Sequence, residues 1–140
     1  MYYTMKISSE QEMLEFGKSF AKKTKPGTII ELIGDVGAGK TTFVRGFATG
    51  LGVKSPVTSP SFTISKSYAL TTGGNLVHYD FYRLSDPGLM AEDLQENLEN
   101  SQNIIVIEWG ESIANLLPKD HIQITINYNE DNSREVTICQ

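Results

Sequence analysis

Apolar residues follow helical spacing in some stretches of the chain and strand-like runs in others, and this alternation predicts the order of its elements. Ser9 followed by Glu12 forms a capping box in front of a loose apolar stripe, which predicts a helix over 9–25. A near-continuous apolar run at 29–33 predicts a strand that is covered on both faces. Helical spacing then returns and predicts a second helix that ends near Gly50.

The second half of the chain is richer in strand patterns. The expected elements are a hairpin of 62–68 with 76–82, a helix from Asp86 and Pro87 to about Glu99, a buried strand at 103–109, and a last hairpin of 121–128 with 135–139. Isoleucines alternate with polar residues in the last hairpin, so we expect a half-exposed antiparallel pair at the edge of the sheet. Together these elements predict one domain over residues 1–140, a small three-layer α/β fold with a mixed, mostly parallel sheet and an antiparallel C-terminal hairpin.

The composition agrees with a single globular domain. The chain has 140 residues, 39% of them hydrophobic and 21% charged, and its one cysteine, Cys139, excludes an intrachain disulfide. No apolar run approaches the ~20 residues that cross a bilayer, and the start lacks the pattern of a signal peptide. We therefore expect a cytoplasmic protein that has no membrane partner.

The charge pattern argues against direct binding of nucleic acid. The net charge is −5, and no basic residue occurs between Arg83 and Lys119, where seven acidic residues fall. DNA is therefore not an expected partner. Such a stretch is usually a solvated acidic face, and a basic protein surface would suit it better than a phosphate backbone.

The strongest chemical signal lies between the first predicted strand and the second helix. Residues 34–41 read GDVGAGKT, which fits the Walker A pattern G-x-x-x-x-G-K-[ST] at every fixed position. The glycines let backbone N–H groups point at a polyphosphate, and the following helix presents its positive end to the same phosphates. The predicted nucleotide contacts, in a P-loop NTPase-like domain, are Gly34, Asp35, Val36, Gly37, Ala38, Gly39, Lys40, Thr41 and Thr42.

Two residues of this loop carry the expected chemistry. Lys40 would bridge the β- and γ-phosphates and act in catalysis, and the hydroxyl of Thr41 would hold Mg²⁺. The alternative is an ordinary glycine-rich turn between a strand and a helix, with a lysine that faces solvent.

A P-loop needs a carboxylate partner, and two acids end predicted strands. Glu108 ends a run of four apolar residues, and Asp80 ends a more polar strand. We expect one of them to hold Mg²⁺, directly or through water, while the other orients the attacking water. The alternative for either is a strand-end carboxylate that caps a helix or pairs with Arg83.

Residues near these acids are weaker candidates. Thr58 and Ser59 lie in a loop rich in Ser, Thr and Pro, which is either a switch-like loop whose threonine senses the γ-phosphate or an ordinary loop. Trp109 follows Glu108, so it is expected either at the edge of the site or in the core. His78 and His121 show no metal-ligand spacing, and we interpret both as structural.

Four motifs along the chain resemble those of one protein family. GDVGAGKTT, SPSFT, HYDFYRL and IEWGE, in this order and at these spacings, are closely similar to the TsaE family, bacterial P-loop ATPases of the tRNA threonylcarbamoyladenosine (t6A) pathway. The resemblance covers essentially the whole chain, and the last three motifs are far more specific than Walker A alone. It implies a mixed-sheet P-loop fold and ATP as substrate with Mg²⁺. It also implies action with TsaD and TsaB on adenosine 37 of tRNAs, with tRNA reached only through that complex.

The same resemblance implies roles for individual residues. These roles are Mg²⁺ ligation by Thr41 and Glu108, hydrolysis by Asp80, switching by Thr58, and nucleotide contact by Trp109, Glu10 and Arg134. Position alone would not have pointed to Glu10, which otherwise reads as a first-turn helix charge, or to Arg134, which reads as a hairpin residue.

Three other functions fit part of the pattern. A small-molecule kinase would need an arginine-bearing lid and an acceptor pocket, and 140 residues with three arginines leave little room for either. A GTP-dependent switch would typically carry an N-K-x-D tetrapeptide, which does not occur in the chain. A nucleotide-binding scaffold without catalysis would show no turnover even with TsaD and TsaB present.

Overall fold

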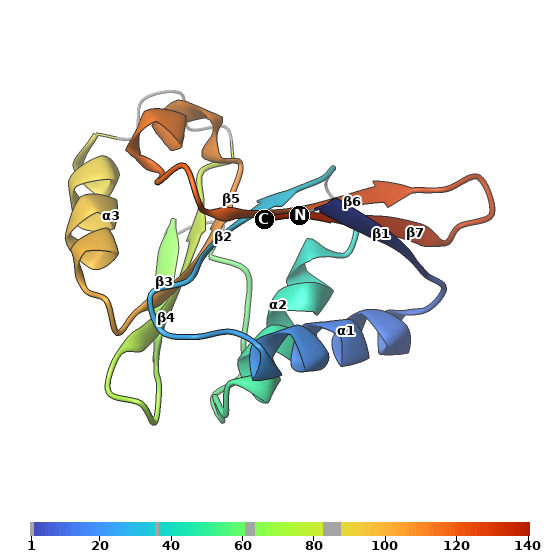
Figure 1. The fold of residues 1–140 in the computed structure, drawn as a ribbon, viewed down its shortest axis with the longest axis horizontal. Helices are drawn as coiled ribbons and strands as arrows, with labels where there is room; N and C mark the ends of the chain where they lie inside the picture. The colour runs from blue at the N-terminus through green and yellow to red at the C-terminus, as the bar shows by residue number, and fades with distance from the viewer. Residues whose placement is uncertain (1, 36, 61–63, 83–87) are drawn as a thin grey trace.

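The computed structural model describes residues 2–35, 37–60, 64–82 and 88–140, which form one seven-stranded sheet with helices on both faces (Figure 1). In chain order the elements are β1 (Tyr2–Ile7), α1 (Glu10–Lys22), β2 (Ile29–Ile33), α2 (Lys40–Gly50), β3 (Ser65–Ala69), β4 (Asn75–Asp80), α3 (Leu89–Glu99), β5 (Ile104–Glu108), the 3₁₀ helix η1 (Gly110–Leu116), β6 (Ile122–Tyr128) and β7 (Arg134–Cys139). The strand order across the sheet is β1-β7-β6-β2-β5-β4-β3.

The three predicted layers are present. Helices α1 and α2 cover one face of the sheet, and α3 with η1 covers the other (Figure 1). Strand β5 shows why its sequence reads as a continuous apolar run: Ile104 and Val106 face the α1–α2 layer, and Ile105 and Ile107 face α3 and η1. The fold is therefore the small α/β domain expected from the hydrophobic pattern.

The sheet is mixed as predicted, but only three of its six strand pairs among the described residues are parallel, and these lie at its centre. Strand β2 pairs in parallel with both β5 and β6, and β5 pairs in parallel with β4. The flanking pairs, β3 with β4, β6 with β7, and β1 with β7, are antiparallel. Because parallel strands end at the same edge, the ends of β2, β4 and β5 meet where the P-loop begins.

Strand β1 was not expected from the sequence, and it changes the edge of the sheet. It pairs with β7 from Tyr2 opposite Cys139 to Ile7 opposite Arg134, so β1 is the edge strand and β7 is not. The predicted edge position of the C-terminal hairpin was therefore wrong. Tyr3, Met5 and Ile7 alternate with polar residues in β1, but only Ile7 is buried, and the pairing of the strand depends on residues at the other end of the chain.

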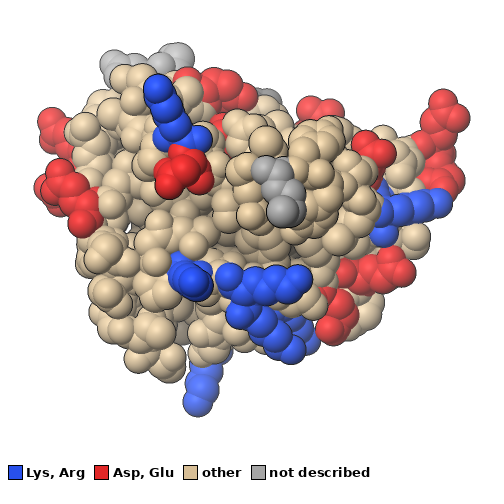
Figure 2. Space-filling model, in the orientation of Figure 1, with Lys and Arg blue, Asp and Glu red and all other residues tan. Residues whose placement is uncertain are grey.

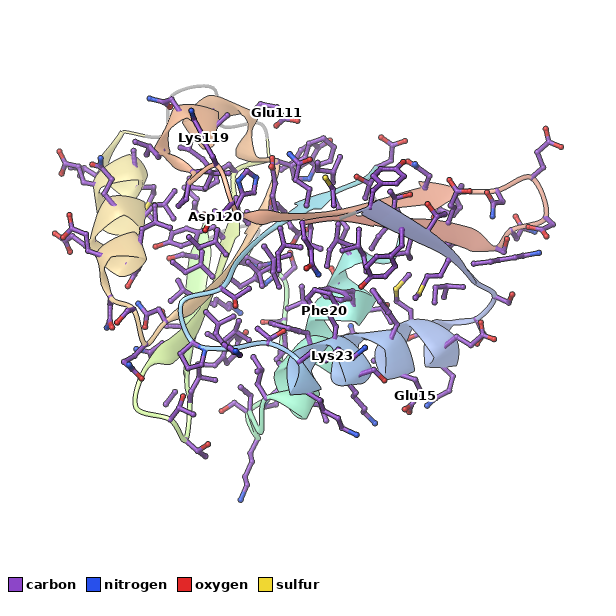
Figure 3. The ribbon with its side chains drawn as sticks, in the orientation of Figure 1. Glu15, Phe20, Lys23, Glu111, Lys119 and Asp120 are labelled. Carbon is purple, nitrogen blue, oxygen red and sulfur yellow. The ribbon has the colours of Figure 1, made fainter. Side chains whose placement is uncertain are left out.

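Two glycines let α1 and α2 approach closely. A Cβ atom on Gly17 would lie 2.5 Å from the carbonyl oxygen of Phe43, and one on Gly46 would lie 2.2 Å from that of Leu14. Figure 3 shows Phe20 on the inner side of α1, where it packs against Phe43 and Phe47. This contact fixes α2, and therefore the helix end that the P-loop enters.

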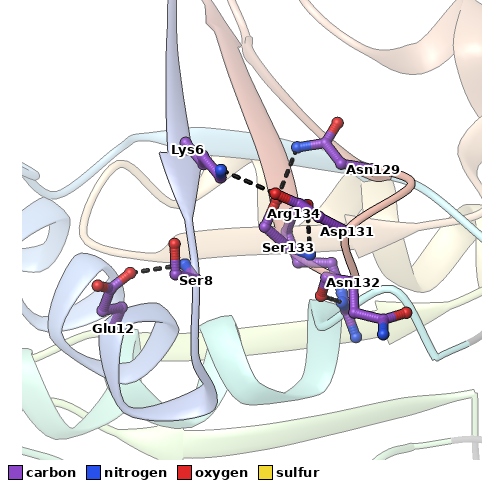
Figure 4. A network of polar contacts seen from close by, with 8 residues as sticks. All are labelled: Lys6, Ser8, Glu12, Asn129, Asp131, Asn132, Ser133 and Arg134. Carbon is purple, nitrogen blue, oxygen red and sulfur yellow. Dashed lines mark hydrogen bonds and ion pairs between the residues drawn. The ribbon is translucent and has the colours of Figure 1, made fainter.

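The capping box of α1 is confirmed in a slightly shifted form. The Oγ of Ser9 accepts a hydrogen bond from the backbone N–H of Glu12 at 3.1 Å, and the carboxylate of Glu12 accepts one from the N–H of Ser8 at 2.6 Å (Figure 4). The helix itself ends at Lys22, three residues earlier than predicted.

The other predicted elements are present with small differences. Helix α3 ends at Glu99 as expected and begins at Leu89 after Gly88, whereas the predicted cap residues Asp86 and Pro87 lie outside the described residues. The hairpin of β3 and β4 is antiparallel as predicted, although 62–63 also lie outside them. No helix in the described ranges is long and apolar enough to cross a membrane.

Candidate nucleotide site

The P-loop joins β2 to α2, and its backbone conformation requires glycine at two points. A Cβ atom on Gly34 would lie 2.5 Å from the carbonyl oxygen of Ile126 on the neighbouring strand. Gly39 has φ 113° and forms the N-cap of α2 without any side-chain cap. The first N–H groups of α2 therefore have no side-chain acceptor, which suits an anion. Val36 lies outside the described residues.

Lys40 is buried at the first position of α2. Its Nζ donates to the carbonyl oxygen of Gly34 at 2.6 Å and lies 3.7 Å from Oε1 of Glu108. It also lies 4.2 Å from the centroid of the Trp109 ring. Only 5% of the side chain is exposed, so these contacts compensate a charge that burial would otherwise disfavour.

The two predicted carboxylates are neighbours in the sheet. Asp80 of β4 is opposite Glu108 of β5, which is in turn opposite Leu32 of β2, just before the loop. Both acids are buried. Burial raises the pKa of the Asp80 carboxyl, the nearby Glu108 charge raises it further, and a hydrogen bond from the Tyr82 N–H opposes the rise. Arg83, the alternative partner of Asp80, lies outside the described residues.

His78 belongs to this cluster, a contact that the sequence analysis missed. Its Nε2 lies 2.6 Å from Oε2 of Glu108, and the imidazole is fully buried. The signal was present in the alternation of β4, because residues 78 and 80 of a strand share a face. His121 lies elsewhere, with Nε2 3.0 Å from Oε1 of Glu31 and Nδ1 2.6 Å from the carbonyl oxygen of Pro118.

A cleft of about 330 Å³ opens in front of these acids, and we call it the carboxylate cleft. It is lined by Gly37, Gly39, Lys40, Thr41, Thr42, Ser59, Asp80, Tyr82, Glu108 and Trp109. Trp109 is thus at the edge of the site, where its ring lies 4.8 Å from that of Tyr82. Its backbone φ of 57° is uncommon for a non-glycine residue and turns the chain at the end of β5.

Thr58 and Asp35 are among the predicted site residues that do not line this cleft. Thr58 is exposed, and its hydroxyl contacts the Nζ of Lys66, while the adjacent Ser59 faces the cleft. Asp35 lines a separate hollow that also contains Glu31 and Trp109.

A second cleft, of about 350 Å³, lies on the other side of the P-loop, and we call it the hairpin cleft. It is lined by Ile7, Ser8, Ser9, Glu10, Met13, Gly37, Ala38, Gly39, Thr42, Asn132 and Arg134. Glu10 and Arg134 are far apart in the sequence, but both line this cleft. Glu10 also lies 4.0 Å from Arg45 on α2.

The turn between β6 and β7 holds the P-loop from this side. The Nε of Arg134 donates to the carbonyl oxygen of Ala38 at 3.0 Å, and the hydroxyl of Tyr128 donates to that of Gly37. The guanidinium of Arg134 also lies over the Tyr128 ring. Tyr128 has no local sequence signal for this role, because its partner lies 91 residues away.

The same turn carries an exposed ion pair (Figure 4). Asp131 accepts hydrogen bonds from the hydroxyl and the N–H of Ser133, and it pairs with Lys6 of β1 at 2.9 Å. The Ser133 hydroxyl and Lys6 hold the pKa of the Asp131 carboxyl well below its usual range. This network ties the turn to β1.

The donors around the carboxylate cleft fit Mg²⁺. Oxygen atoms are available from the hydroxyl of Thr41 and the carboxylates of Asp80 and Glu108. Within the described ranges, no group of three or more His, Cys, Asp or Glu residues is placed to hold a metal by itself. This sparse set suits Mg²⁺, which commonly takes one or two carboxylates and completes its shell with water and phosphate oxygens.

Comparison with known proteins gives one consistent family. Residues 7–136 match the family model described as "Threonylcarbamoyl adenosine biosynthesis protein TsaE". The tRNA threonylcarbamoyladenosine biosynthesis protein TsaE of Streptomyces coelicolor is 40% identical over 90% of this chain and 88% of its own length. That of Bacillus subtilis is 41% identical over 91% and 78%. The crystal structure of Bacillus subtilis YdiB matches with a TM-score of 0.81 and 36% identity, over 99% of this chain and 84% of that one.

Proposed function

Because this chain belongs to the TsaE family of tRNA t6A biosynthesis proteins, we propose that it binds and hydrolyses ATP with Mg²⁺ and so supports t6A formation at adenosine 37, together with TsaD and TsaB. The observation that carries this proposal is the position of Lys40, which is buried between the P-loop carbonyl of Gly34 and the strand-end carboxylate of Glu108. A lysine held there can exchange these contacts for the β- and γ-phosphates without leaving the cleft.

The residues of the carboxylate cleft divide the remaining work. Thr41 and Glu108 would hold Mg²⁺, which when bound supplies charge neutralisation at the phosphates. Asp80 would accept a proton from, or align, the attacking water. Burial raises its pKa, and this makes it a stronger base than an exposed carboxylate.

The hairpin cleft provides room for the rest of the nucleotide. It meets the carboxylate cleft at Gly37, Gly39 and Thr42, so one ligand can cross the loop from one cleft to the other. We place the phosphates beside Lys40 and the nucleoside toward Glu10 and Arg134. Trp109 remains beside the phosphate end of this arrangement.

Switching by Thr58 requires a rearrangement of its loop. Its hydroxyl now contacts Lys66, whereas its neighbour Ser59 lines the cleft. Exchange of the Lys66 contact would allow Thr58 to sense the γ-phosphate.

The proposed partners would supply a group that the carboxylate cleft does not contain among the described residues. Among the residues that the structure describes, no arginine lines the carboxylate cleft, so we expect slow hydrolysis by the isolated protein. Figure 2 shows basic side chains near the C-terminal end of α1, and acidic side chains near the start of α1 and over α3. We propose that TsaD and TsaB complete the site and that tRNA is reached through them, in the cytoplasm.

The test is ATP turnover by the wild-type protein and by Asp80→Asn, alone and with TsaD, TsaB and tRNA. We expect slow turnover alone, faster turnover with the partners, and formation of t6A only with the complete set. Asp80→Asn should keep ATP binding and lose turnover by on the order of a hundredfold. A rate that is indifferent to the partners, or a preference for GTP over ATP, would contradict the proposal.

A further inference from the structure

The geometry points to His78 as a positioning residue that fixes the orientation of the Glu108 carboxylate toward the part of the carboxylate cleft where Mg²⁺ would bind. This inference rests on the proposed function, because it assigns a role within the same site. It concerns a side chain that touches neither cleft and that no part of the P-loop pattern identifies.

The contact is built into the core of the sheet. His78 is opposite Val106, two residues before Glu108 on the adjacent strand, so both side chains leave the same face. Nε2 of His78 lies 2.6 Å from Oε2 of Glu108, with the imidazole 0% exposed and the carboxylate side chain 6% exposed. A hydrogen bond this short and this well shielded from water restricts the carboxylate strongly.

The second ring nitrogen fixes the direction of the hydrogen bond. Nδ1 of His78 is buried and has no hydrogen-bond partner among the described residues. An N–H at that position would be a buried donor without an acceptor, which costs more than burying an unprotonated nitrogen. The proton therefore belongs on Nε2, and His78 donates it to Glu108.

The two oxygens of Glu108 consequently have separate tasks. Oε2 is held by His78 from inside the sheet, and Oε1 lies 3.7 Å from Nζ of Lys40 on the cleft side. When Lys40 turns to the phosphates, the bond from His78 keeps Oε1 directed into the cleft. Outer partners of this kind, which orient a ligating group, typically change metal affinity by about 10–100-fold when removed.

The chain offers a matched control in its second histidine. Nε2 of His121 also contacts a carboxylate, that of Glu31, at 3.0 Å. This pair is more exposed, and neither side chain lines the carboxylate cleft or the hairpin cleft. The His121 variant therefore shows what the loss of any histidine–carboxylate contact does, and the His78 variants show what the loss of the contact that orients Glu108 does.

The experiment compares His78→Phe, His78→Gln and His121→Phe with the wild type. Calorimetry measures ADP affinity with Mg²⁺ and with EDTA, and thermal unfolding reports stability. We expect His78→Phe to lower the Mg²⁺-dependent gain in affinity about tenfold and to change the EDTA value less than about twofold. His78→Gln, whose amide can reach Oε2, should restore most of that gain, and His121→Phe should leave it unchanged.

Further outcomes separate the alternatives. If affinity falls equally with Mg²⁺ and with EDTA, or if the gain is unchanged in folded His78→Phe, the positioning role is overturned. If His78→Phe does not fold, His78→Asn replaces it, because the shorter asparagine amide stays polar but does not reach Oε2 of Glu108. Equal Mg²⁺ dependence of ADP affinity in His78→Asn and His78→Gln would then overturn the proposal. If the wild type itself binds no nucleotide, the proposed function fails first.

Discussion

The carboxylate cleft and the hairpin cleft share Gly37, Gly39 and Thr42, yet their other walls come from different parts of the fold. The carboxylate cleft is built on the ends of adjacent parallel strands, and its charged groups Lys40, Asp80 and Glu108 are buried. The hairpin cleft is built from the end of β1, the start of α1 and the β6–β7 turn, and its charged lining residues Glu10 and Arg134 are not buried.

This difference separates two requirements of a nucleotide site. Buried charged groups interact more strongly with phosphates than exposed ones do, because the local dielectric constant is low. Charges that hold the outer part of a ligand can remain exposed, where each contributes modestly. We therefore expect changes in the carboxylate cleft to affect both phosphate binding and chemistry, and changes in the hairpin cleft to affect affinity alone.

The largest effect should come from removing the buried charge of Lys40, which the proposed mechanism uses both to bind the phosphates and to act in catalysis. Lys40→Ala should weaken ATP binding by roughly a hundredfold or more, because a charge-assisted contact to the phosphates is lost. The fluorescence of Trp109, the only tryptophan, gives the titration, since its ring lies 4.2 Å from Nζ of Lys40. Lys18→Ala is a control on a lysine of α1 that pairs with Glu15 and lines neither cleft.

The same experiment tests the assignment of the loop. A folded Lys40→Ala protein, shown by circular dichroism, that binds ATP as the wild type does would falsify the role given to the P-loop. An unchanged Trp109 spectrum at saturating ATP, with binding shown by calorimetry, would instead remove Trp109 from the site.

An intermediate effect is expected on the hairpin side. Arg134→Ala should weaken ATP binding about tenfold and leave turnover at saturating ATP nearly unchanged, because it removes a contact to Ala38 and a charge beside the nucleoside but none of the buried groups. The measurement is KM against kcat in the presence of TsaD and TsaB.

Lys6→Ala serves as the matched control for Arg134→Ala. It removes a cation from the same end of the molecule, and Lys6 does not line the hairpin cleft. A loss of kcat in Arg134→Ala comparable to its change in KM would show that the two clefts do not divide the work.

The smallest effect concerns stability. The contributions of Asp80 and Asp131 to stability should change with pH in opposite directions. Burial raises the pKa of Asp80 in the folded state, so its ionised form costs stability as pH rises above the ordinary carboxyl value of about 4. Asp80→Asn, which keeps an oxygen for the Tyr82 N–H, should therefore raise Tm at pH 7 by roughly 3 °C. This gain should shrink as pH falls toward 4.

Asp131 gives the opposite case. Its pKa is lowered by the Ser133 hydroxyl and by Lys6, so its contribution to stability is present above the ordinary carboxyl pKa and is lost as pH falls. Asp131→Asn should lower Tm at pH 7 and have less effect in acid. Thermal unfolding of both variants between about pH 2 and pH 7 tests this contrast, because the Asp80 effect changes above pH 4 and the Asp131 effect changes below it. Slopes of the same sign would contradict it.

The sequence predicted one side of the site much better than the other, for a physical reason. The P-loop glycines, Asp80 and Glu108 are marked by local patterns, because a strand followed by an acid or by a glycine loop is visible within about ten residues. The hairpin side depends on pairings such as Tyr128 with Gly37 and Lys6 with Asp131, which are 91 and 125 residues apart. No local period records such contacts.

His78 and β1 show two different ways in which sequence interpretation fell short. For His78 the alternation placed the side chain on the face of Asp80, but nothing local indicated that Glu108 would be its neighbour across the sheet. For β1 the alternation of Tyr3, Met5 and Ile7 with polar residues is short, and most of its side chains are exposed, so the local signal is weak. Its strand conformation comes from pairing with β7 and not from its own hydrophobic pattern.

The pairing of β1 with β7 also sets an order of assembly during synthesis on the ribosome. β1 is made first, and its only strand neighbour in the described part of the chain is made last. At about 5–20 residues per second, on the order of 10 s separates the two strands. No described residue after Trp109 lines the carboxylate cleft, whereas the lining of the hairpin cleft is incomplete until Asn132 and Arg134 have emerged. A nascent chain therefore possesses the groups for chemistry before it possesses the turn that holds the P-loop in place.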